Sequence, residues 1–181
     1  MCERIVGMVL ATDFGLHVKI LSEFKMMVGK EVPVDAEGTA ANVAAPTTYR
    51  LRKHGLPVFT AKATTMTDVE QLTVASMIIK VADLSYPTKG FDYSMIWIER
   101  CLEEFMEQGD REKERGLPVG YDRDTLAAWK AKSQVGFFSF MVKPMYEALD
   151  LVAPMTEQLT ALDTLITHWQ EKVAAASADR I

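Results

Sequence analysis

The sequence has little cysteine and little histidine. Cys2 and Cys101 are its two thiols, and its three histidines are His17, His54 and His168. Two cysteines without a paired spacing exclude a disulfide framework and suit a reducing compartment, so we expect a cytoplasmic protein with a free, buried Cys101. No two histidines share a helix face, so their spacing alone does not predict a histidine metal site.

Long runs of one kind of residue are also missing. No apolar run approaches the roughly 18 residues that a membrane-spanning helix needs, and the N-terminal stretch MCERIVGMVLATDFG lacks the basic start of a signal peptide. The formal net charge is -5, the pI is about 5.3, and no long basic run offsets this acidity. We therefore expect a soluble chain that binds no nucleic acid and inserts into no membrane.

Neither a period of two nor an internal repeat is visible, so the class expected is all-α, as a helical bundle. A chain of 181 residues with 49% hydrophobic residues can bury one domain core, which we place at residues 1–176. The expected helices are 5–28 with a break at ATDFG, 68–82, 91–108, about 124–150 with a kink or break at Pro144, and 154–176. Residues 30–67 predict a long loop insert, and 177–181 a frayed tail.

The helix caps are predicted from single residues. Thr12 or Asp13 suits the N-cap of a second helix that starts near Phe14, and Asp68 suits the N-cap of the next. Gly109 is the expected C-cap of the helix over 91–108.

Asp83 raises a question, because the apolar run LTVASMIIKVA leads directly into its carboxylate. The C-terminal end of a helix disfavours a negative charge. One interpretation is a turn residue with Lys80 as a partial partner, where Ser85 and Pro87 complete the helix stop. The other is a ligand to a divalent cation, which would neutralise the charge.

The segment KSQVGFFSF combines an amide with aromatic rings. On a helix, Gln134 lies one turn from Phe137 and Phe138. Such an arrangement suits a flat heteroaromatic ligand, whose edge the amide reads while a ring stacks on its face. An ordinary helical core explains the same spacing.

A third polar group consists of Thr12, Asp13 and His17, within two helical turns. Helix capping explains the first two residues, and His17 could pair with Asp13 four residues earlier. This group alone does not indicate a functional site.

Four segments together resemble one family: MVLATDFGLHVKIL, IIKVADLSYPTKG, WIERCLEEFMEQGDREKERGLP and KSQVGFFSFMVKPMYEAL. They resemble the C-terminal half of the catalytic domain of class I cyclic nucleotide phosphodiesterases, an HD-superfamily-like helical fold. The resemblance implies hydrolysis of a 3′,5′-cyclic nucleotide, cAMP or cGMP or both, to the 5′-monophosphate in cyclic nucleotide signalling. It also implies two divalent cations, zinc and magnesium, that hold the phosphate and activate a bridging hydroxide.

The resemblance assigns roles to single residues. Asp83 matches the zinc-ligating aspartate of the family, Gln134 the glutamine that hydrogen-bonds the purine, and Phe137 the phenylalanine that stacks on it. The matching residues of the pocket wall, and of the floor near the metals, are Phe105, Thr12, Asp13 and Phe14. At three positions of the pocket wall, this sequence differs from residues found in other members of the family. These positions are Tyr86, Ile98 and Cys101. The differences leave open whether adenine or guanine is bound.

One part of the family pattern has no counterpart in this sequence. The histidine-rich first half, with the general-acid histidine and further metal ligands, is expected upstream of Met1, and His17 is not assigned to the metal site. We therefore expect the chain to expose apolar surface and to be inactive alone, as part of an enzyme completed by the missing half or as a homo-oligomer. The alternative is a non-catalytic helical remnant that binds nucleotide or partner proteins.

Overall fold

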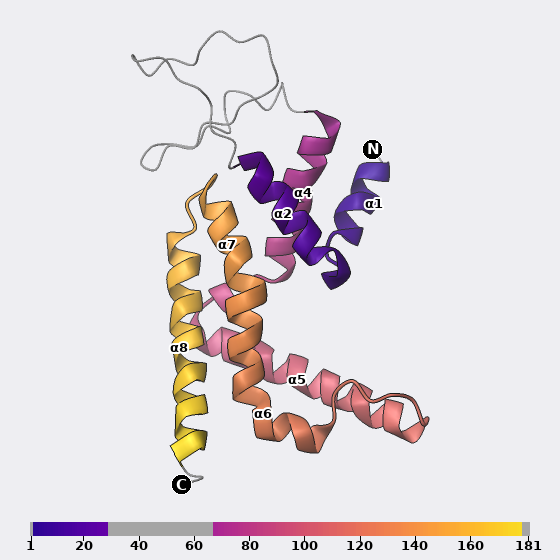
Figure 1. Cartoon of the computed structure of the whole chain (residues 1–181), viewed down its shortest axis with the longest axis vertical. Helices are drawn as coiled ribbons and strands as arrows, with labels where there is room; N and C mark the ends of the chain where they lie inside the picture. The colour runs from indigo at the N-terminus through magenta and orange to yellow at the C-terminus, as the bar shows by residue number, and fades with distance from the viewer. Residues whose placement is uncertain (1, 29–66, 179–181) are drawn as a thin grey trace. The chain divides into compact units, whose positions relative to one another are not determined.

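A computed structural model describes residues 2–28 and 67–178 of the chain, and within these ranges every regular element is a helix (Figure 1). The all-α prediction is confirmed. The elements are α1 (Cys2–Leu10), η1 (Phe14–Leu16), α2 (His17–Val28), α4 (Asp68–Asp83), η3 (Tyr86–Thr88), α5 (Phe91–Glu114), α6 (Arg123–Gly136), η4 (Phe137–Val142), α7 (Lys143–Asp150) and α8 (Thr156–Ala178). The insert expected at 30–67 lies outside the described residues except for Thr67, and α8 includes the first two residues of the expected tail.

The chain divides into two compact units. Unit 1 contains the described residues up to Asp83 together with residues 145–155, and unit 2 contains residues 84–144 and 156–178. In unit 1, α1 and α2 both pack against α4. Phe24 and Met77 are fully buried in this core, and Tyr146 of α7 donates a hydrogen bond from its hydroxyl to the Val81 carbonyl at 3.2 Å.

The break between the first two helices is a capped turn, as predicted. The Asp13 Oδ1 atom accepts a hydrogen bond from the Gly15 N–H at 2.8 Å and so caps η1, which leads directly into α2. The short polar side chain of Asp13 thus satisfies a backbone donor that the start of a helix leaves unpaired.

The predicted N-cap of α4 is wrong by one residue. Thr67, not Asp68, caps this helix: its hydroxyl accepts from the Glu70 N–H at 3.3 Å, while the Glu70 carboxylate accepts from the Thr67 N–H at 2.8 Å. This reciprocal pair is a capping box, which the spacing of threonine and glutamate already encodes.

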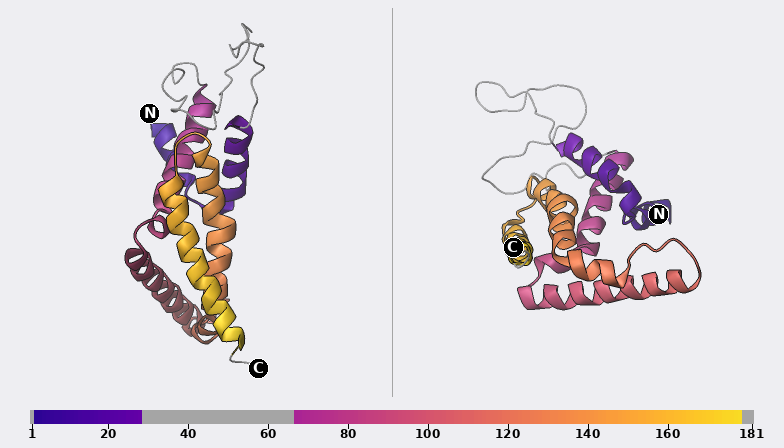
Figure 2. Two further views of the ribbon diagram at one scale, coloured as in Figure 1. Left: turned by 90° about the vertical axis from the view of Figure 1, so that its left-hand side faces the viewer. Right: turned by 60° about the horizontal axis from the view of Figure 1, so that its bottom comes forward.

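In unit 2, α8 packs against α6, η3 and η4, and α5 packs against η3 and α6 (Figure 2). The buried apolar residues of this unit include Ile98, Leu102, Phe138, Val142, Leu162 and Leu165. Two ion pairs join its helices at 2.6 Å, one between Lys130 and Glu99 and one between Lys143 and Asp163.

The chain stays helical through Pro144, although proline usually breaks or kinks a helix. The chain passes from α6 through the π-helix η4 into α7 without an intervening loop. Proline lacks an N–H and crowds the carbonyl four residues earlier, so a helix that continues through it has to change its hydrogen-bond pattern nearby. The π-helical turns of η4 are this change, and they contain Phe137 and Phe138.

Gly109 is not a C-cap, contrary to our prediction. It lies inside α5, which continues to Glu114, and Gly116 with φ of 66° ends the helix instead. The Leu117 N–H donates to the Glu112 carbonyl at 2.9 Å and the Gly116 N–H to the Lys113 carbonyl at 3.2 Å. These two bonds form a Schellman motif, whose positive φ favours glycine.

Among the helices described, none is by itself long and apolar enough to cross a membrane. The segments Arg4–Leu10 and Phe14–Val28 meet the length and composition criteria only as a pair, and they are bent by 93° relative to each other.

Candidate functional site

The residues that match the family's site occur in both units. Unit 1 holds Thr12, Asp13, Phe14 and Asp83, and unit 2 holds the residues of the expected purine pocket. The two groups are therefore described separately.

Asp83 is the last residue of α4, and its side chain is exposed. It makes no hydrogen bond or ion pair with the described residues. Burial lowers the pKa of Lys80, and the negative charge of Asp83 opposes this shift without cancelling it. Water and the nearby ammonium group therefore explain why this carboxylate is tolerated at a helix end.

The surroundings of Asp83 do not complete a metal site. Within residues 2–28 and 67–178, no group of three or more histidine, cysteine, aspartate or glutamate side chains could hold a metal ion. One exposed carboxylate can fill a single ligand position of a zinc or magnesium ion, and such an ion needs several further ligands.

The turn before α2 holds the other candidate residues of unit 1. The Thr12 hydroxyl donates to the Val9 carbonyl at 2.8 Å, while the Asp13 carboxylate caps η1. The Phe14 ring lies 5.3 Å from the Lys80 Nζ atom and stacks near His17, with 6.1 Å between the ring centroids.

His17 is the most deeply buried histidine of the described residues, at 2% exposure. Neither ring nitrogen has a hydrogen-bond partner there, so the expected pairing with Asp13 is wrong. Burial lowers the pKa of the imidazole, and the positive charge of Lys80 lowers it further. His17 is therefore a neutral core residue near neutral pH.

This lowered pKa predicts a loss of stability in mild acid. Because the folded pKa lies below the unfolded value of about 6.5, the unfolded chain binds more protons, and stability falls as the pH drops from about 6.5 through the folded pKa. His17→Phe, which cannot titrate, should lose less stability than wild type between pH 7.5 and 5.0 in urea unfolding. Equal losses of unfolding free energy in the two proteins would contradict the prediction. A difference between the proteins that is already present at pH 7.5 reports the change in packing and not titration.

In unit 2, Gln134 lies near the end of α6 and is only 8% exposed. Its side chain makes no hydrogen bond with the described residues, yet solvent reaches its amide. The Phe137 N–H donates to the Gln134 carbonyl, which confirms that the two residues are one turn apart. A nearly buried amide with unused donors and acceptors can read the edge of a ligand.

Three aromatic rings, two of them close to Gln134 in the sequence, contact one another in series. The ring centroids of Phe137 and Phe138 are 5.5 Å apart, and those of Phe138 and Tyr86 are 6.4 Å apart, both in edge-to-face geometry. Burial raises the pKa of the Tyr86 phenol, and the Cys101 thiol adds to this increase. Cys101 is free and half-buried rather than buried, and burial together with Glu104 raises its pKa.

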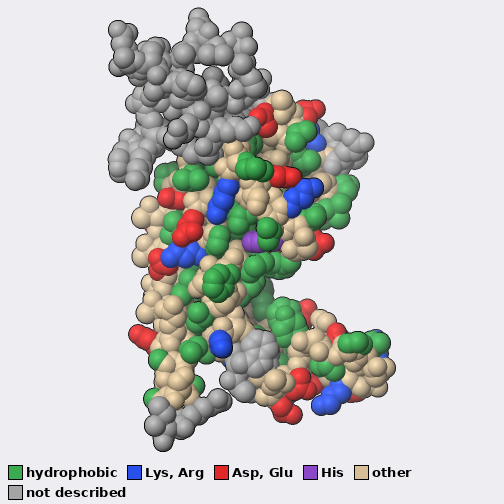
Figure 3. Space-filling model, viewed as in Figure 1, with side chains coloured by type: hydrophobic (Ala, Val, Ile, Leu, Met, Phe, Trp, Pro, Cys, Tyr) green, Lys and Arg blue, Asp and Glu red, His purple; other side chains and the backbone are tan. Residues whose placement is uncertain are grey.

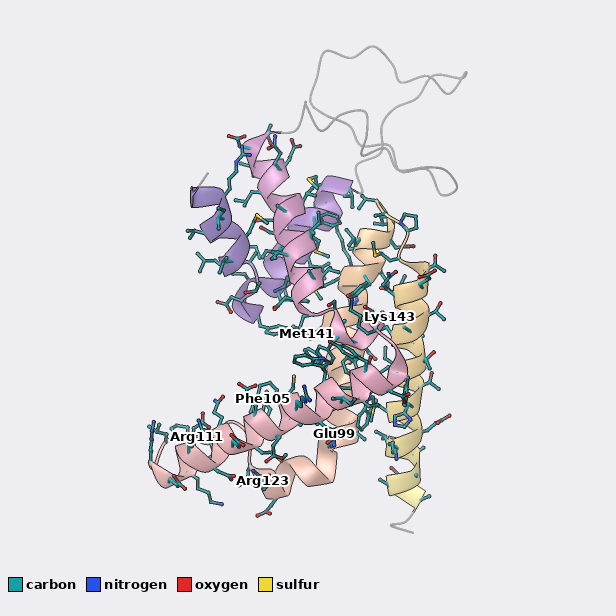
Figure 4. The ribbon with its side chains drawn as sticks, turned by 180° about the vertical axis from the view of Figure 1, so that it is seen from behind. Glu99, Phe105, Arg111, Arg123, Met141 and Lys143 are labelled. Carbon is teal, nitrogen blue, oxygen red and sulfur yellow. The ribbon has the colours of Figure 1, made fainter. Side chains whose placement is uncertain are left out.

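Phe105 and Ile98 project from α5 in different environments. Ile98 is buried, whereas Phe105 is partly exposed and stacks on Tyr121 with ring centroids 4.7 Å apart and an interplanar angle of 12°. Figure 4 shows Phe105 on α5. Tyr121 belongs to the loop before α6. Tyr121 was not predicted from the sequence, because nothing in the local pattern indicates a contact between residues on different elements.

Two surface hollows of unit 2 are lined by other residues. One of about 580 Å³ is lined by Phe91 and α8, and one of about 640 Å³ lies along the C-terminal part of α5. Neither is lined by Gln134, Phe137 or Phe105.

Solved phosphodiesterase structures share this fold. The structure titled LmjPDEB1 in complex with IBMX matches with a TM-score of 0.69 at 24% identity, over 96% of this chain and 43% of that one. The phosphodiesterase domain of Salpingoeca rosetta rhodopsin phosphodiesterase matches with a TM-score of 0.65 at 24% identity, over 98% of this chain and 45% of that one.

Curated proteins show closer sequence similarity. The probable 3′,5′-cyclic-AMP phosphodiesterase pde-4 of Caenorhabditis elegans is 33% identical over 86% of this chain, and 3′,5′-cyclic-AMP phosphodiesterase 4C of Mus musculus is 33% identical over 90% of it. This chain spans 20% of the length of each of these relatives. The family model of 3′5′-cyclic nucleotide phosphodiesterases matches residues 1–164, and the chain belongs to that family.

Proposed function

We propose that this chain supplies the purine-recognition part and one metal ligand of a catalytic domain that hydrolyses 3′,5′-cyclic AMP to the 5′-monophosphate. The observation that carries the proposal is Gln134, which is nearly buried, has no side-chain partner among the described residues and lies one turn from Phe137. The names of the C. elegans and mouse relatives support cyclic AMP as the substrate.

Gln134 and Phe137 divide the recognition of the base between them. The amide donates to and accepts from the purine edge, and the Phe137 ring stacks on the purine face. Phe138 contacts both the Phe137 and the Tyr86 rings, so it supports this surface from the core. The remaining wall of the purine site is assigned to Tyr86, Ile98, Cys101 and Phe105.

Asp83 is the residue that would bind a divalent cation. Its exposed carboxylate lies at the end of a well-packed helix, and Thr12, Asp13 and Phe14 are assigned to the floor near the metals. When bound, zinc and magnesium would polarise the phosphate and lower the pKa of water. Because the described residues hold no group of three ligands, we expect the isolated chain to have no appreciable activity.

A second candidate function follows from α1. Its apolar residues Ile5, Val6, Val9 and Leu10 are each more than half exposed, and their spacing places them in a stripe on one face of the helix. Hydrophobic side chains are visible on the surface at α1 in Figure 3. Uncovered apolar stripes of this kind mark surfaces that pack against other helices. The stripe favours an interaction with further helices, and the matched solved structures are more than twice as long as the part that aligns with this chain.

The proposed function is tested in a chimera that joins residues 1–178 to the preceding part of the mouse relative's catalytic domain. Gln134→Ala should weaken cyclic AMP binding by about 2- to 12-fold, as expected for a lost hydrogen bond of about 0.5–1.5 kcal/mol. Phe137→Ala should weaken binding of cyclic AMP and cyclic GMP alike, because stacking does not depend on the edge groups. Calorimetry and hydrolysis of both nucleotides measure these effects.

Phe140→Ala is the matched control, because Phe140 lies in the same π-helix but is exposed. It should leave the binding of both nucleotides unchanged. Loss of one purine but not the other in Phe137→Ala would show that the stacking assignment is wrong. Hydrolysis by the 181-residue chain alone, well above a metal-free reaction, would contradict the expected inactivity.

A further inference from the structure

Lys80 is an unusual core residue of unit 1. It lies on α4 with only 1% of its surface exposed, although a buried ammonium group loses its hydration. Such a group is stable in a protein interior only where acceptors replace the lost water. The acceptors around the Nζ atom therefore identify the part of the fold that Lys80 stabilises.

Three backbone carbonyls of one turn accept from this ammonium group. The Nζ atom lies 3.1 Å from the Ala11 oxygen, 3.5 Å from the Thr12 oxygen and 3.2 Å from the Asp13 oxygen. A lysine ammonium has three donors and no acceptor, so three carbonyls match its full capacity. These carbonyls directly follow α1, at the negative end of the helix dipole, where a cation is favourable.

Lys80 also interacts with side chains near this turn. The Phe14 ring lies 5.3 Å from the Nζ atom, within the range of a cation–π interaction. The carboxylates of Asp13 and Asp83 also interact favourably with the charge of Lys80. The Thr12 and Asp13 side chains direct their hydrogen bonds to Val9 and Gly15, within the segment around the turn, whereas Lys80 donates hydrogen bonds from α4 to the turn's backbone.

We propose that Lys80 is a positioning residue that fixes the Ala11–Phe14 turn to the C-terminal end of α4. Asp83 follows Lys80 by one helical turn, so this tie sets the place of Thr12, Asp13 and Phe14 relative to the Asp83 carboxylate. Any effect of this positioning on catalysis depends on the proposed function, whereas the hydrogen bonds from Lys80 to the turn do not.

Amide hydrogen exchange of the full 181-residue chain tests the proposal without nucleotide or metal. In Lys80→Met, which keeps the length of the side chain but removes its charge and donors, the amides of residues 11–16 should exchange about tenfold faster or more. The amides of α8 in unit 2 should keep their wild-type rates. The matched control is Lys19→Met, because Lys19 lies on the exposed side of α2 and should change neither set.

Chemical rescue separates the ammonium group from general packing. Lys80→Cys, alkylated with 2-bromoethylamine in denaturant and refolded, carries an aminoethyl side chain of nearly the same length as lysine. Protection of residues 11–16 should return to that of wild type treated in the same way, in which Cys2 and Cys101 are also alkylated. Uncharged alkylation with iodoethane should not restore it.

The outcomes are distinct. Unchanged exchange of residues 11–16 in Lys80→Met would overturn the proposal, as would faster exchange of equal size in α8. Rescue by iodoethane as good as by bromoethylamine would also overturn it, because packing alone would then hold the turn. None of these results depends on nucleotide hydrolysis, so failure of the tie and failure of the proposed function remain distinguishable.

Discussion

Phe138→Ala should destabilise the protein by about 3–5 kcal/mol, the range found when a buried phenylalanine is removed from a core. Phe138 is 0% exposed, and its ring contacts those of Phe137 and Tyr86. The substitution removes these contacts and leaves a cavity in the core. Urea unfolding, followed by near-ultraviolet circular dichroism, measures the loss.

Phe140→Ala provides the comparison within the same element. Phe140 is 78% exposed, so its removal should change the free energy of unfolding by no more than about 0.5 kcal/mol. Both variants delete the same atoms from η4, and the difference between them reports burial alone. Similar losses in the two variants would show that this part of unit 2 is not packed as described.

The course of the helices was predictable from local chemistry. Apolar periodicity identified each long helix. Asp13 was one of the two residues predicted to cap the second helix, and it is the cap because its short side chain reaches a backbone donor two residues on. The cap of α4 was misplaced because Thr67 and Asp68 are both good caps, and the spacing of Thr67 and Glu70 in a capping box was not considered.

Contacts between distant segments were not predictable. Lys80 was interpreted as a partial partner of Asp83 on its own helix, but its three acceptors come from the turn after α1, far away in sequence. Tyr121 likewise contacts Phe105 across two elements. Local spacing contains no information on either contact, because each depends on how helices pack.

The purine candidates were the part of the site that sequence spacing described best. Gln134 and Phe137 are one turn apart on adjoining helical segments, so the spacing places them together whatever the tertiary structure. Asp83 is different, because its proposed role as a metal ligand needs further ligands, and no group of three such ligands occurs among the described residues. The structure shows its exposure, and its assignment as a zinc ligand stays a prediction.

The second large effect is expected from Gly109→Ala. A Cβ atom at Gly109 would lie 1.7 Å from the Tyr121 carbonyl oxygen and 2.8 Å from its carbonyl carbon, too close for any real contact. Since both are backbone atoms, the loop before α6 has to move away from α5. Overpacking of this kind costs about 1–3 kcal/mol or more, which exceeds the gain of about 1 kcal/mol from alanine in a helix.

The displaced loop should also lose its side-chain contacts. Tyr121 stacks on Phe105, and Arg123, at the start of α6, pairs with Glu103 at 3.1 Å and with Asp110 at 3.0 Å on α5 (Figure 4). In Gly109→Ala we therefore expect faster trypsin cleavage after Arg115, together with a lower free energy of unfolding. Since Phe105 is assigned to the purine wall, nucleotide binding by the chimera should weaken as well.

Gly136→Ala is the matched control for this prediction. Gly136 is the last residue of α6, and a Cβ atom there would meet nothing within 4 Å. With no steric cost, alanine should stabilise the helix by about 0.5–1 kcal/mol. The two glycine substitutions should thus change stability in opposite directions, and a gain in both would mean that the close approach of Tyr121 to α5 does not exist in solution.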